Sequence, residues 1–347
     1  MSHVVRKRAA IVGYGLLVAL LSTPSGYGQP APVGTPNART TPLPSGKIWV
    51  VGDKGFIAHT EDGGLTWQKQ PSGSETHFYS VSFANSQSGW AVGYPTTVLH
   101  TEDGGRSWKT QETGVKAQIT ALYGVAFVSD QSGWTVGYPN LILHTEDGGR
   151  SWHNQYTGNA DLADQFKAVT FLTPKTGWVV GNRGLILHTE DGGRTWQRQP
   201  SGTETDLDSI AFITPKSGWA TGYANWRHIV LHTEDGGLTW QEKEIGTYRD
   251  QFGDIYFNEV KSGWIMLLEP KDEGSFLHTE DGGITWQKRK TGIDETLGFI
   301  RFGTPQLGVL VGNFGTILTT GDGGLTWQQR DSGTEEGWIH AVAFANP

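Results

Sequence analysis

The sequence contains no cysteine among its 347 residues. Without cysteine no disulfide can form and no lipid can be attached through a thiol, which excludes a lipoprotein. Packing and sheet hydrogen bonds alone must therefore hold the core, and about 300 residues bury enough surface for this. The histidines show no metal-ligand spacing, so we expect neither a metal nor a cofactor.

The sequence also lacks an apolar run long enough to cross a bilayer. The candidate, Ala9–Leu21, is well short of the roughly 20 residues that a bilayer core requires. Three basic residues at positions 6 to 8 precede this run, and a small, polar stretch follows it. This order is typical of a secretory signal peptide. We therefore expect residues 1–28 to be a cleaved signal peptide and the protein to be exported, to a periplasm or the extracellular space.

Basic residues are outnumbered, with 27 Lys and Arg against 35 Asp and Glu and a net charge of −8. Removing residues 1–28 leaves 24 basic against 35 acidic side chains, a net charge of −11. We expect no nucleic-acid partner, because phosphate backbones attract cationic surfaces. Residues 29–46 are rich in proline, show no hydrophobic pattern and are typical of a semi-extended linker. The folded domain is expected over residues 47–347.

Glycine and tryptophan are abundant, with 49 and 15 residues, which indicates many turns and large aromatic packing units. Both recur in one box, His-Thr-Glu-Asp-Gly-Gly-x-(Thr/Ser)-Trp, with small variations. The spacing between copies is 41 to 46 residues, which is typical of propellers and solenoids. The box aspartates are Asp62, Asp103, Asp147, Asp191, Asp235, Asp281 and Asp322.

Each repeat contains four short segments of strand character separated by turn residues. In the third repeat they are the alternating segment 125–127, the Gly-Trp segment 133–137, the apolar segment 141–144 and the segment after the box. Four strands per repeat predict a propeller blade. The first repeat lacks its first strand, and residues 339–344 supply it at the other chain end. We therefore predict an all-β, seven-bladed β-propeller with four-stranded antiparallel blades, in which both chain ends share one blade.

The box residues are expected to be structural. Asp accepts backbone N–H groups within its own turn, Gly permits positive φ, and Trp packs between blades. Seven equivalent copies around a ring cannot converge on one substrate, so we expect no catalytic residue and no metal ligand among them. The same reasoning applies to the six repeated histidines at positions 59, 100, 144, 188, 232 and 278.

The box resembles the Asp-box, or bacterial neuraminidase (BNR) repeat. The succession Gly-Trp-x-Val-Gly, Gly-x-Ile-Leu-His-Thr and Asp-Gly-Gly-x-Thr-Trp over residues 47–347 is most similar to the photosystem II stability and assembly factors. This resemblance implies a non-enzymatic, exported scaffold that assists assembly or stability of a membrane-protein complex in photosynthesis. It implies a protein partner, an exported segment of a membrane protein, and the thylakoid lumen or a periplasm as location. We expect a monomer.

That family is associated with an Arg-rich surface patch, whereas this chain is poor in arginine. Arg106, Arg150 and Arg194 occupy the same box position in three successive repeats and are expected to form an arc on one face. Drift among repeats would also place solvated arginines there, so the arc has two interpretations.

The connections between strands fall into two classes. The first-to-second-strand turn and the box turn have constant lengths, and we expect both on one face of the disc. The second-to-third connection spans seven residues from Gly52 to His59, but ten from Gly222 to His232 and eleven from Leu267 to His278. Variable loops on a rigid scaffold usually carry binding, so we predict the interaction surface on the opposite face, near repeats five and six.

Residues that break the repeat pattern support this placement. Trp226 and Trp338 are the two tryptophans outside the box and Gly-Trp positions, and Tyr256 and Arg301 replace the small residue of other first strands. We assign the latter two to repeats five and six as well. An aromatic plug and local ion pairs of an inserted loop would explain the same residues without binding. The candidate binding residues are Trp226, Arg227, His228, Arg249, Tyr256, Lys271, Arg301 and Trp338.

The alternative function is a carbohydrate-binding protein or a sialidase-like glycoside hydrolase. Arg183, Arg227, Arg249 and Arg301 allow a substrate-carboxylate clamp, but the Arg-Ile-Pro segment of sialidases is absent. Spacing selects no acid pair among Asp206, Asp208, Asp250, Glu269 and Asp294. A quinone-cofactor propeller is disfavoured because no metal-ligand set is visible. We therefore expect a scaffold and not an enzyme.

Overall fold

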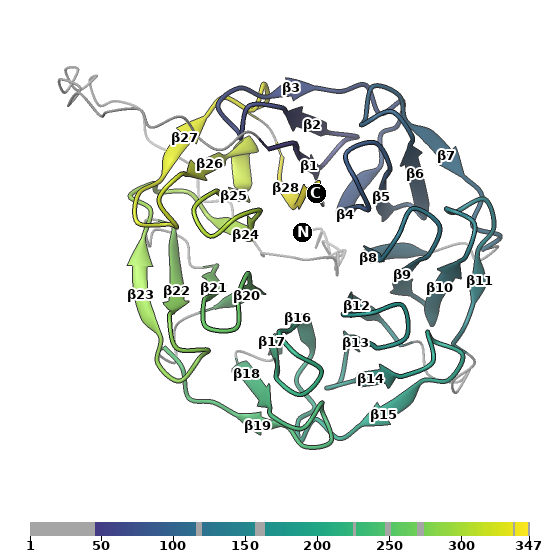
Figure 1. Ribbon diagram of the computed structural model, residues 1–347, viewed down its shortest axis with the longest axis vertical. Coiled ribbons are helices and arrows are strands. Elements are labelled where there is room, and N and C mark those ends of the chain that lie inside the picture. Colours follow the sequence, from purple (N-terminus) through teal and green to yellow (C-terminus); the bar gives the residue numbers. More distant parts are fainter. Residues whose placement is uncertain are drawn as a thin grey trace, which may run out of the picture. The chain divides into compact units, whose positions relative to one another are not determined.

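The computed structural model describes residues 46–345 apart from 116–119, 157–163, 225–226, 247–250, 269–273 and 336. These residues form seven four-stranded antiparallel sheets arranged in a ring (Figure 1). The predicted seven-bladed β-propeller is confirmed. The expected signal peptide, and all of the expected linker except its last residue, lie outside the described residues. Within the part of the chain that the structure describes, no helix is long and apolar enough to cross a membrane.

We number the blades one to seven along the chain. The innermost strands, which surround the axis in Figure 1, are β28 (Ile339–Phe344) in blade one, β4 (His77–Phe83), β8 (Ala121–Phe127), β12 (Phe166–Phe171), β16 (Leu207–Phe212), β20 (Phe252–Phe257) and β24 (Leu297–Phe302). The second strands are β1 (Ile48–Gly52), β5 (Gly89–Tyr94), β9 (Gly133–Tyr138), β13 (Gly177–Gly181), β17 (Gly218–Ala224), β21 (Gly263–Leu267) and β25 (Gly308–Gly312).

The third strands are β2 (Ile57–Thr60), β6 (Thr97–Thr101), β10 (Leu141–Thr145), β14 (Ile186–Thr189), β18 (Arg227–Thr233), β22 (Ser275–Thr279) and β26 (Ile317–Thr320). The outer strands are β3 (Gln68–Lys69), β7 (Lys109–Gln111), β11 (His153–Asn154), β15 (Gln197–Gln199), β19 (Gln241–Glu242), β23 (Gln287–Lys290) and β27 (Gln328–Arg330). A 3-10 turn, η1 (Asn313–Gly315), lies between β25 and β26. The outer strands of the seven blades are short and polar, which discourages pairing with another chain.

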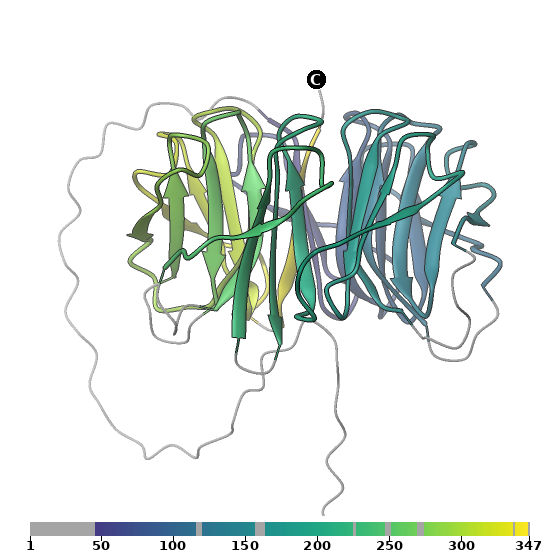
Figure 2. The ribbon, with the colours of Figure 1, turned by 90° about the horizontal axis from the view of Figure 1, so that it is seen from below.

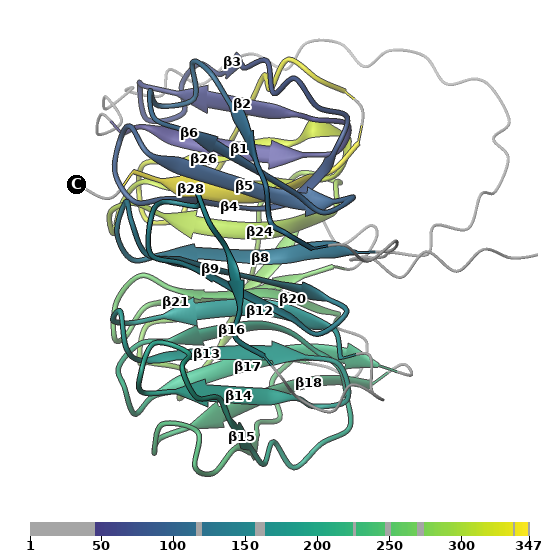
Figure 3. The same ribbon diagram turned by 90° about the vertical axis from the view of Figure 1, so that its right-hand side faces the viewer.

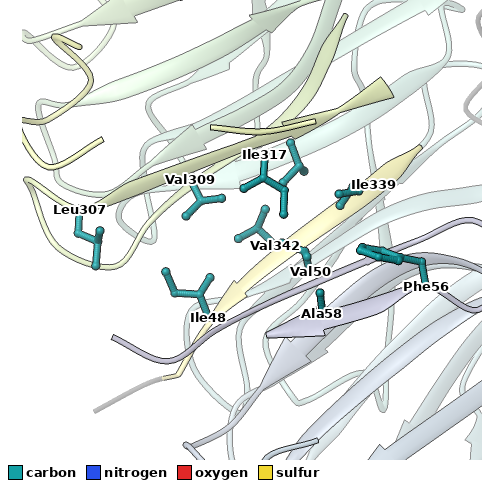
Figure 4. Close-up of a cluster of buried hydrophobic side chains, with 10 residues drawn as sticks. Ile48, Val50, Phe56, Ala58, Leu307, Val309, Ile317, Ile339 and Val342 are labelled. Carbon is teal, nitrogen blue, oxygen red and sulfur yellow. The ribbon is translucent and has the colours of Figure 1, made fainter. Parts of the chain in front are cut away.

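Blade one contains both ends of the folded chain. β28 pairs antiparallel with β1, with Val342 opposite Val50, so the last strand is the innermost strand of the first blade. Figure 4 shows the buried cluster at this closure, in which Ile48 and Val50 pack with Val309 and other aliphatic residues of blade seven. The predicted shared blade is therefore confirmed, and the ring closes without a disulfide.

The seams between blades are built from stacked aromatic rings. Trp90 of β5 lies with its ring centroid 3.4 Å from that of Phe127 on the next inner strand, at an interplanar angle of 5°. Its indole N–H donates to the Gly148 carbonyl of the next box, at 3.1 Å. His100 stacks on the other side at 4.5 Å. Each Gly-Trp residue is thus shared between two blades, except in blade seven, where Val309 takes its place.

The Asp of each box is bonded within its own turn. In blade three, Asp147 accepts the Ser151 hydroxyl at 2.6 Å and the Ser151 backbone N–H at 2.9 Å, and these bonds lower its pKa to about 2. Gly148 and Gly149 have φ of 72° and 87°, values that favour glycine. The Gly148 N–H donates to Gln131 in the first hairpin of the same blade, at 2.9 Å.

This contact places the box turn and the first-to-second-strand turn on the same side of the blade, as predicted. We call this side the box face. The second-to-third-strand hairpins lie at the other ends of the strands, on what we call the hairpin face. Figures 2 and 3 show the strands of neighbouring blades side by side, with turns at two opposite faces.

Stability should fall in acid in two steps. Burial lowers the pKa of the stacked histidines, and that of His278 falls to about 4. The folded state then binds fewer protons than the unfolded chain, so stability is lost as pH falls below 6.5. The pKa of each box aspartate is also lowered, to about 2 for Asp147, so a second loss follows as pH falls below 3.8.

Thermal unfolding followed by circular dichroism across this range tests the prediction. We expect His278→Gln to flatten the first step. The matched variant His153→Gln changes an exposed histidine on β11 and should leave the profile unchanged. A single step below pH 4 in the unsubstituted protein would contradict the role of the histidines.

Candidate functional site

Each inner strand carries a β-bulge near the hairpin face. The register with the second strand skips one residue or two at this point in all seven blades. Bulges leave a residue out of the ladder and re-aim its side chain, and they are frequent beside active sites. We define the bulge ring as the first residue skipped in each blade: Tyr79, Tyr123, Lys167, Asp208, Gly253, Gly298 and His340.

Blades one to three contribute aromatic residues to this ring. The Tyr79 and Tyr123 rings are stacked with centroids 5.6 Å apart, and His340 meets Tyr79 edge-on at 5.3 Å. Trp338 lies 6.3 Å from His340, nearly parallel to it. Tyr94, at the end of β5, is 45% exposed. Burial, Tyr123, Asp53 and Tyr94, in that order, raise the pKa of Tyr79 to about 12. We call Tyr79, Tyr94, Tyr123, Trp338 and His340 the aromatic cluster.

Asp53, in the hairpin after β1, holds part of this cluster in place. Its Oδ1 lies 2.9 Å from His340 Nε2 and 2.8 Å from His77 Nδ1, and its Oδ2 accepts the Trp338 backbone N–H at 2.9 Å. These partners outweigh burial and hold the pKa of Asp53 well below its usual range. Asp53 therefore links β1, β4 and the start of β28.

In blades four and five the bulge-ring residues are charged. Lys167 is largely buried, and its Nζ lies 2.7 Å from Asp208 Oδ1 and 3.1 Å from Asp206 Oδ2. Burial alone would lower the pKa of Lys167, but the two carboxylates outweigh it and raise the pKa. Arg183, in the hairpin of blade four, bonds Asp164 at 2.5 Å. Burial raises the pKa of Asp208, against the effect of Lys167. Lys167 and Arg183 thus each have an acidic partner.

Comparisons with known proteins give the family. A family model described as the photosynthesis system II assembly factor YCF48 matches residues 44–117, 110–204 and 199–292, which is most of the chain. This chain belongs to the YCF48 family. The predicted resemblance to photosystem II assembly factors is thereby confirmed, and a scaffold of the assembly-factor type is the class of protein that it supports.

Solved structures share the fold. A structure of YCF48 bound to D1 peptide is 21% identical, with a TM-score of 0.63 over 81% of this chain and 86% of that one. YCF48 from Cyanidioschyzon merolae is 21% identical, with a TM-score of 0.61 over 78% and 90%. A GH74 xyloglucanase from Xanthomonas campestris is 12% identical, with a TM-score of 0.63 over 82% and 52%. No curated protein matches the sequence.

In this YCF48-family chain the predicted binding residues that the structure describes lie in different places and do not form one site. Trp338 lies in the aromatic cluster. Arg227 begins β18, and His228 stacks on Tyr223 across the β17–β18 hairpin at 4.3 Å. The remaining loop candidates, Trp226, Arg249 and Lys271, lie outside the described residues.

Tyr256 and Arg301 need a correction, because they lie on β20 in blade six and β24 in blade seven, not in repeats five and six. The Arg301 guanidinium pairs with buried Asp254 and lies 5.0 Å from the Tyr256 ring. The Tyr256 hydroxyl donates to the Phe302 carbonyl at 2.8 Å. Both side chains thus bind elements of the neighbouring inner strand and join blades six and seven.

The arginine arc lies on the box face, opposite the aromatic cluster. Arg106, Arg150 and Arg194 are exposed at equivalent turn tips, but each turn also holds an ionised Asp and an exposed Glu. Arg150 lies 4.0 Å from Glu102. The same position in the other four blades is aliphatic and exposed: Leu65, Leu238, Ile284 and Leu325.

Sequence reasoning missed most of the hairpin-face site. It identified Trp338 but not Tyr79, Tyr123, Tyr94 or Asp53. A signal was available in the residue two before the first-strand Val or Ile. It is Tyr in two repeats, Gly in two, and Lys, Asp or His in the other three, whereas the residue before it is Phe, Leu or Ile in every repeat. Among the described residues no group of three or more His, Asp or Glu side chains has the geometry of a metal site.

Proposed function

We propose that this YCF48-family chain is a non-enzymatic, exported scaffold that holds an extended segment of a membrane protein against the aromatic cluster. The observation that carries this proposal is the bulge ring, which brings Tyr79, Tyr123 and His340 together from three blades. Tyr and Trp provide large contact areas at low conformational-entropy cost, and both are enriched among residues that dominate binding.

The rigidity of the aromatic cluster supports the same proposal. His340 is held by Asp53, Tyr123 is buried, and all three strands are paired within their blades. A preorganised surface loses little entropy on binding. The YCF48 structure that carries a D1 peptide adds the precedent of a peptide on this fold.

Peptides from the exported segments of the host's membrane proteins test the proposal. Their affinities for the mature chain can be measured by fluorescence anisotropy. We expect Tyr79→Ala combined with Tyr123→Ala to weaken binding by at least about tenfold, equivalent to about 1.4 kcal/mol. Leu238→Ala, on the exposed box face, is the control and should bind normally. Unchanged affinity in a double variant that melts like the control overturns the proposal.

The likeness to a xyloglucanase favours a carbohydrate as the second candidate ligand. Aromatic rings also stack on sugars, so binding to glycans must be measured alongside peptides. Two acids considered for catalysis, Asp206 and Asp208, both bond Lys167, and two arginines of the sialidase clamp, Arg183 and Arg301, each pair with an aspartate. Turnover of a xyloglucan or a sialoside would overturn the scaffold proposal.

A further inference from the structure

Three cations beside the inner strands already have acidic partners. Lys167 contacts two carboxylates, Arg183 contacts Asp164, and Arg301 contacts Asp254. An acidic ligand approaching these groups would compete with an existing ion pair. A carboxylate would have to leave its partner to make room, and breaking a buried ion pair is costly.

Acidic residues recur in the connections that lead into the inner strands. In four of these connections the second residue after a positive-φ glycine is acidic and exposed. These connections lie against the hairpins, as shown by the Gly55 N–H, which donates to the Thr76 carbonyl at 2.7 Å. The four residues are Glu75, Glu204, Asp294 and Glu335. We call them the acidic rim.

Two groups at this face have a raised pKa to which a neighbouring carboxylate contributes. Burial and the neighbouring Asp294 raise the pKa of Glu295, beside the rim. The charge of Asp53 is among the causes that raise the pKa of Tyr79 in the aromatic cluster. A cation near either place would relieve this repulsion.

The rings of the aromatic cluster also favour a basic ligand. The faces of Tyr rings attract Lys and Arg side chains, more strongly where the contact is desolvated. The chain already contains one such contact, with Arg301 above Tyr256 at 5.0 Å. The net charge of −8 would further steer a basic segment toward the protein.

From the proposed function, we infer that the bound segment is basic, with Lys or Arg side chains over the aromatic cluster and a backbone that crosses the acidic rim. This gives the face a selectivity that the arginine arc would not provide. The arc lies on the other face, among carboxylates of its own turns.

The test is a charge series built on the tightest peptide from the membrane-protein scan. Its Lys and Arg residues are replaced by Gln in one version and by Glu in another. We expect the Gln version to bind at least about tenfold more weakly, and the Glu version more weakly still. Binding of the basic peptide should weaken as salt rises from about 0.05 to 0.3 M, because screening shortens the range of the attraction.

Two protein variants with the same change in net charge give the control. Glu204→Lys alters the acidic rim, whereas Glu190→Lys alters an exposed residue of a box turn on the opposite face. Glu204→Lys should weaken binding of the basic peptide and strengthen binding of the Glu version. Glu190→Lys should change the affinity for neither peptide. Tyr79→Leu should reduce the preference for the basic peptide over its Gln version.

The outcomes separate this inference from the proposed function. If all three versions bind equally, or if neutral or acidic segments are the tightest in the scan, the inference is wrong and the scaffold remains. If no peptide binds, both are wrong. Equal effects of Glu204→Lys and Glu190→Lys would assign the attraction to net charge and overturn the proposed location.

Discussion

Trp90→Ala is expected to lower the free energy of unfolding by about 3–5 kcal/mol, the range for truncating a buried aromatic residue. Trp90 is 0% exposed and lies between His100 and Phe127. Truncation would remove both stacking contacts and the bond to the Gly148 carbonyl. The two blades would then face each other across a cavity. Urea unfolding followed by circular dichroism measures the change.

The controls distinguish the seam from a general effect of substitution. Leu238→Ala removes a side chain that is 70% exposed, and its effect should stay within about 0.5 kcal/mol. Trp90→Phe keeps an aromatic ring and should fall between the two. A loss below about 1 kcal/mol in Trp90→Ala would mean that the seams contribute little, because cavity formation alone should exceed that value.

The sequence predicted this seam only in part. Glycine and tryptophan recur at fixed spacing, so Trp90 and its counterparts were recognisable as packing residues. The stacking partner was not, because Phe127 belongs to the next blade and its contact depends on how the blades pack. The box was predictable in more detail, since the bonds of Asp147 stay within four residues of it. Local geometry follows from local sequence, and contacts between blades do not.

The site shows the same limit more strongly. Inserted residues led us to predict the interaction surface near repeats five and six. In blade five these residues lengthen the β17–β18 hairpin, in which each strand has seven residues. Tyr79 and Tyr123 attract no notice in an alternating strand, because alternation alone assigns them a face. Only the cross-strand register reveals that they leave the ladder at a bulge. Trp338 was found because it is an exception to the repeat, a property visible without coordinates.

The bulge ring is uneven around the axis. Blades one to three bear aromatic rings, blades four and five a lysine with its carboxylates, and blades six and seven the glycines 253 and 298. A Cβ on Gly298 would lie 3.4 Å from the Trp338 ring. Trp338 therefore covers the small residue and extends the aromatic cluster toward blade seven. An asymmetric surface of this kind can orient a bound segment, which a symmetric ring cannot.

The orientation of Trp338 depends on Asp53, so Asp53→Ala should affect both stability and binding. We expect a loss of about 2–3 kcal/mol in the free energy of unfolding, because truncation leaves the backbone N–H of Trp338 and the buried His340 ring without this acceptor. Asp53→Asn should lose less, since its amide oxygen can still accept one of these bonds. Asp130→Ala, an exposed aspartate of a box-face turn, is the matched control.

Hydrogen exchange locates the effect. Asp53 bonds β28 at its first residues, so the amides that pair β28 with β1 should exchange faster in Asp53→Ala, while those of β16 in blade five change less. Peptide affinity should fall together with this protection, because His340 and Trp338 lose their fixed positions. Uniform acceleration in all blades would show that Asp53 supports the whole ring and not its closure. Unchanged exchange in β28 would show that the β1–β28 pairing closes the ring without this carboxylate.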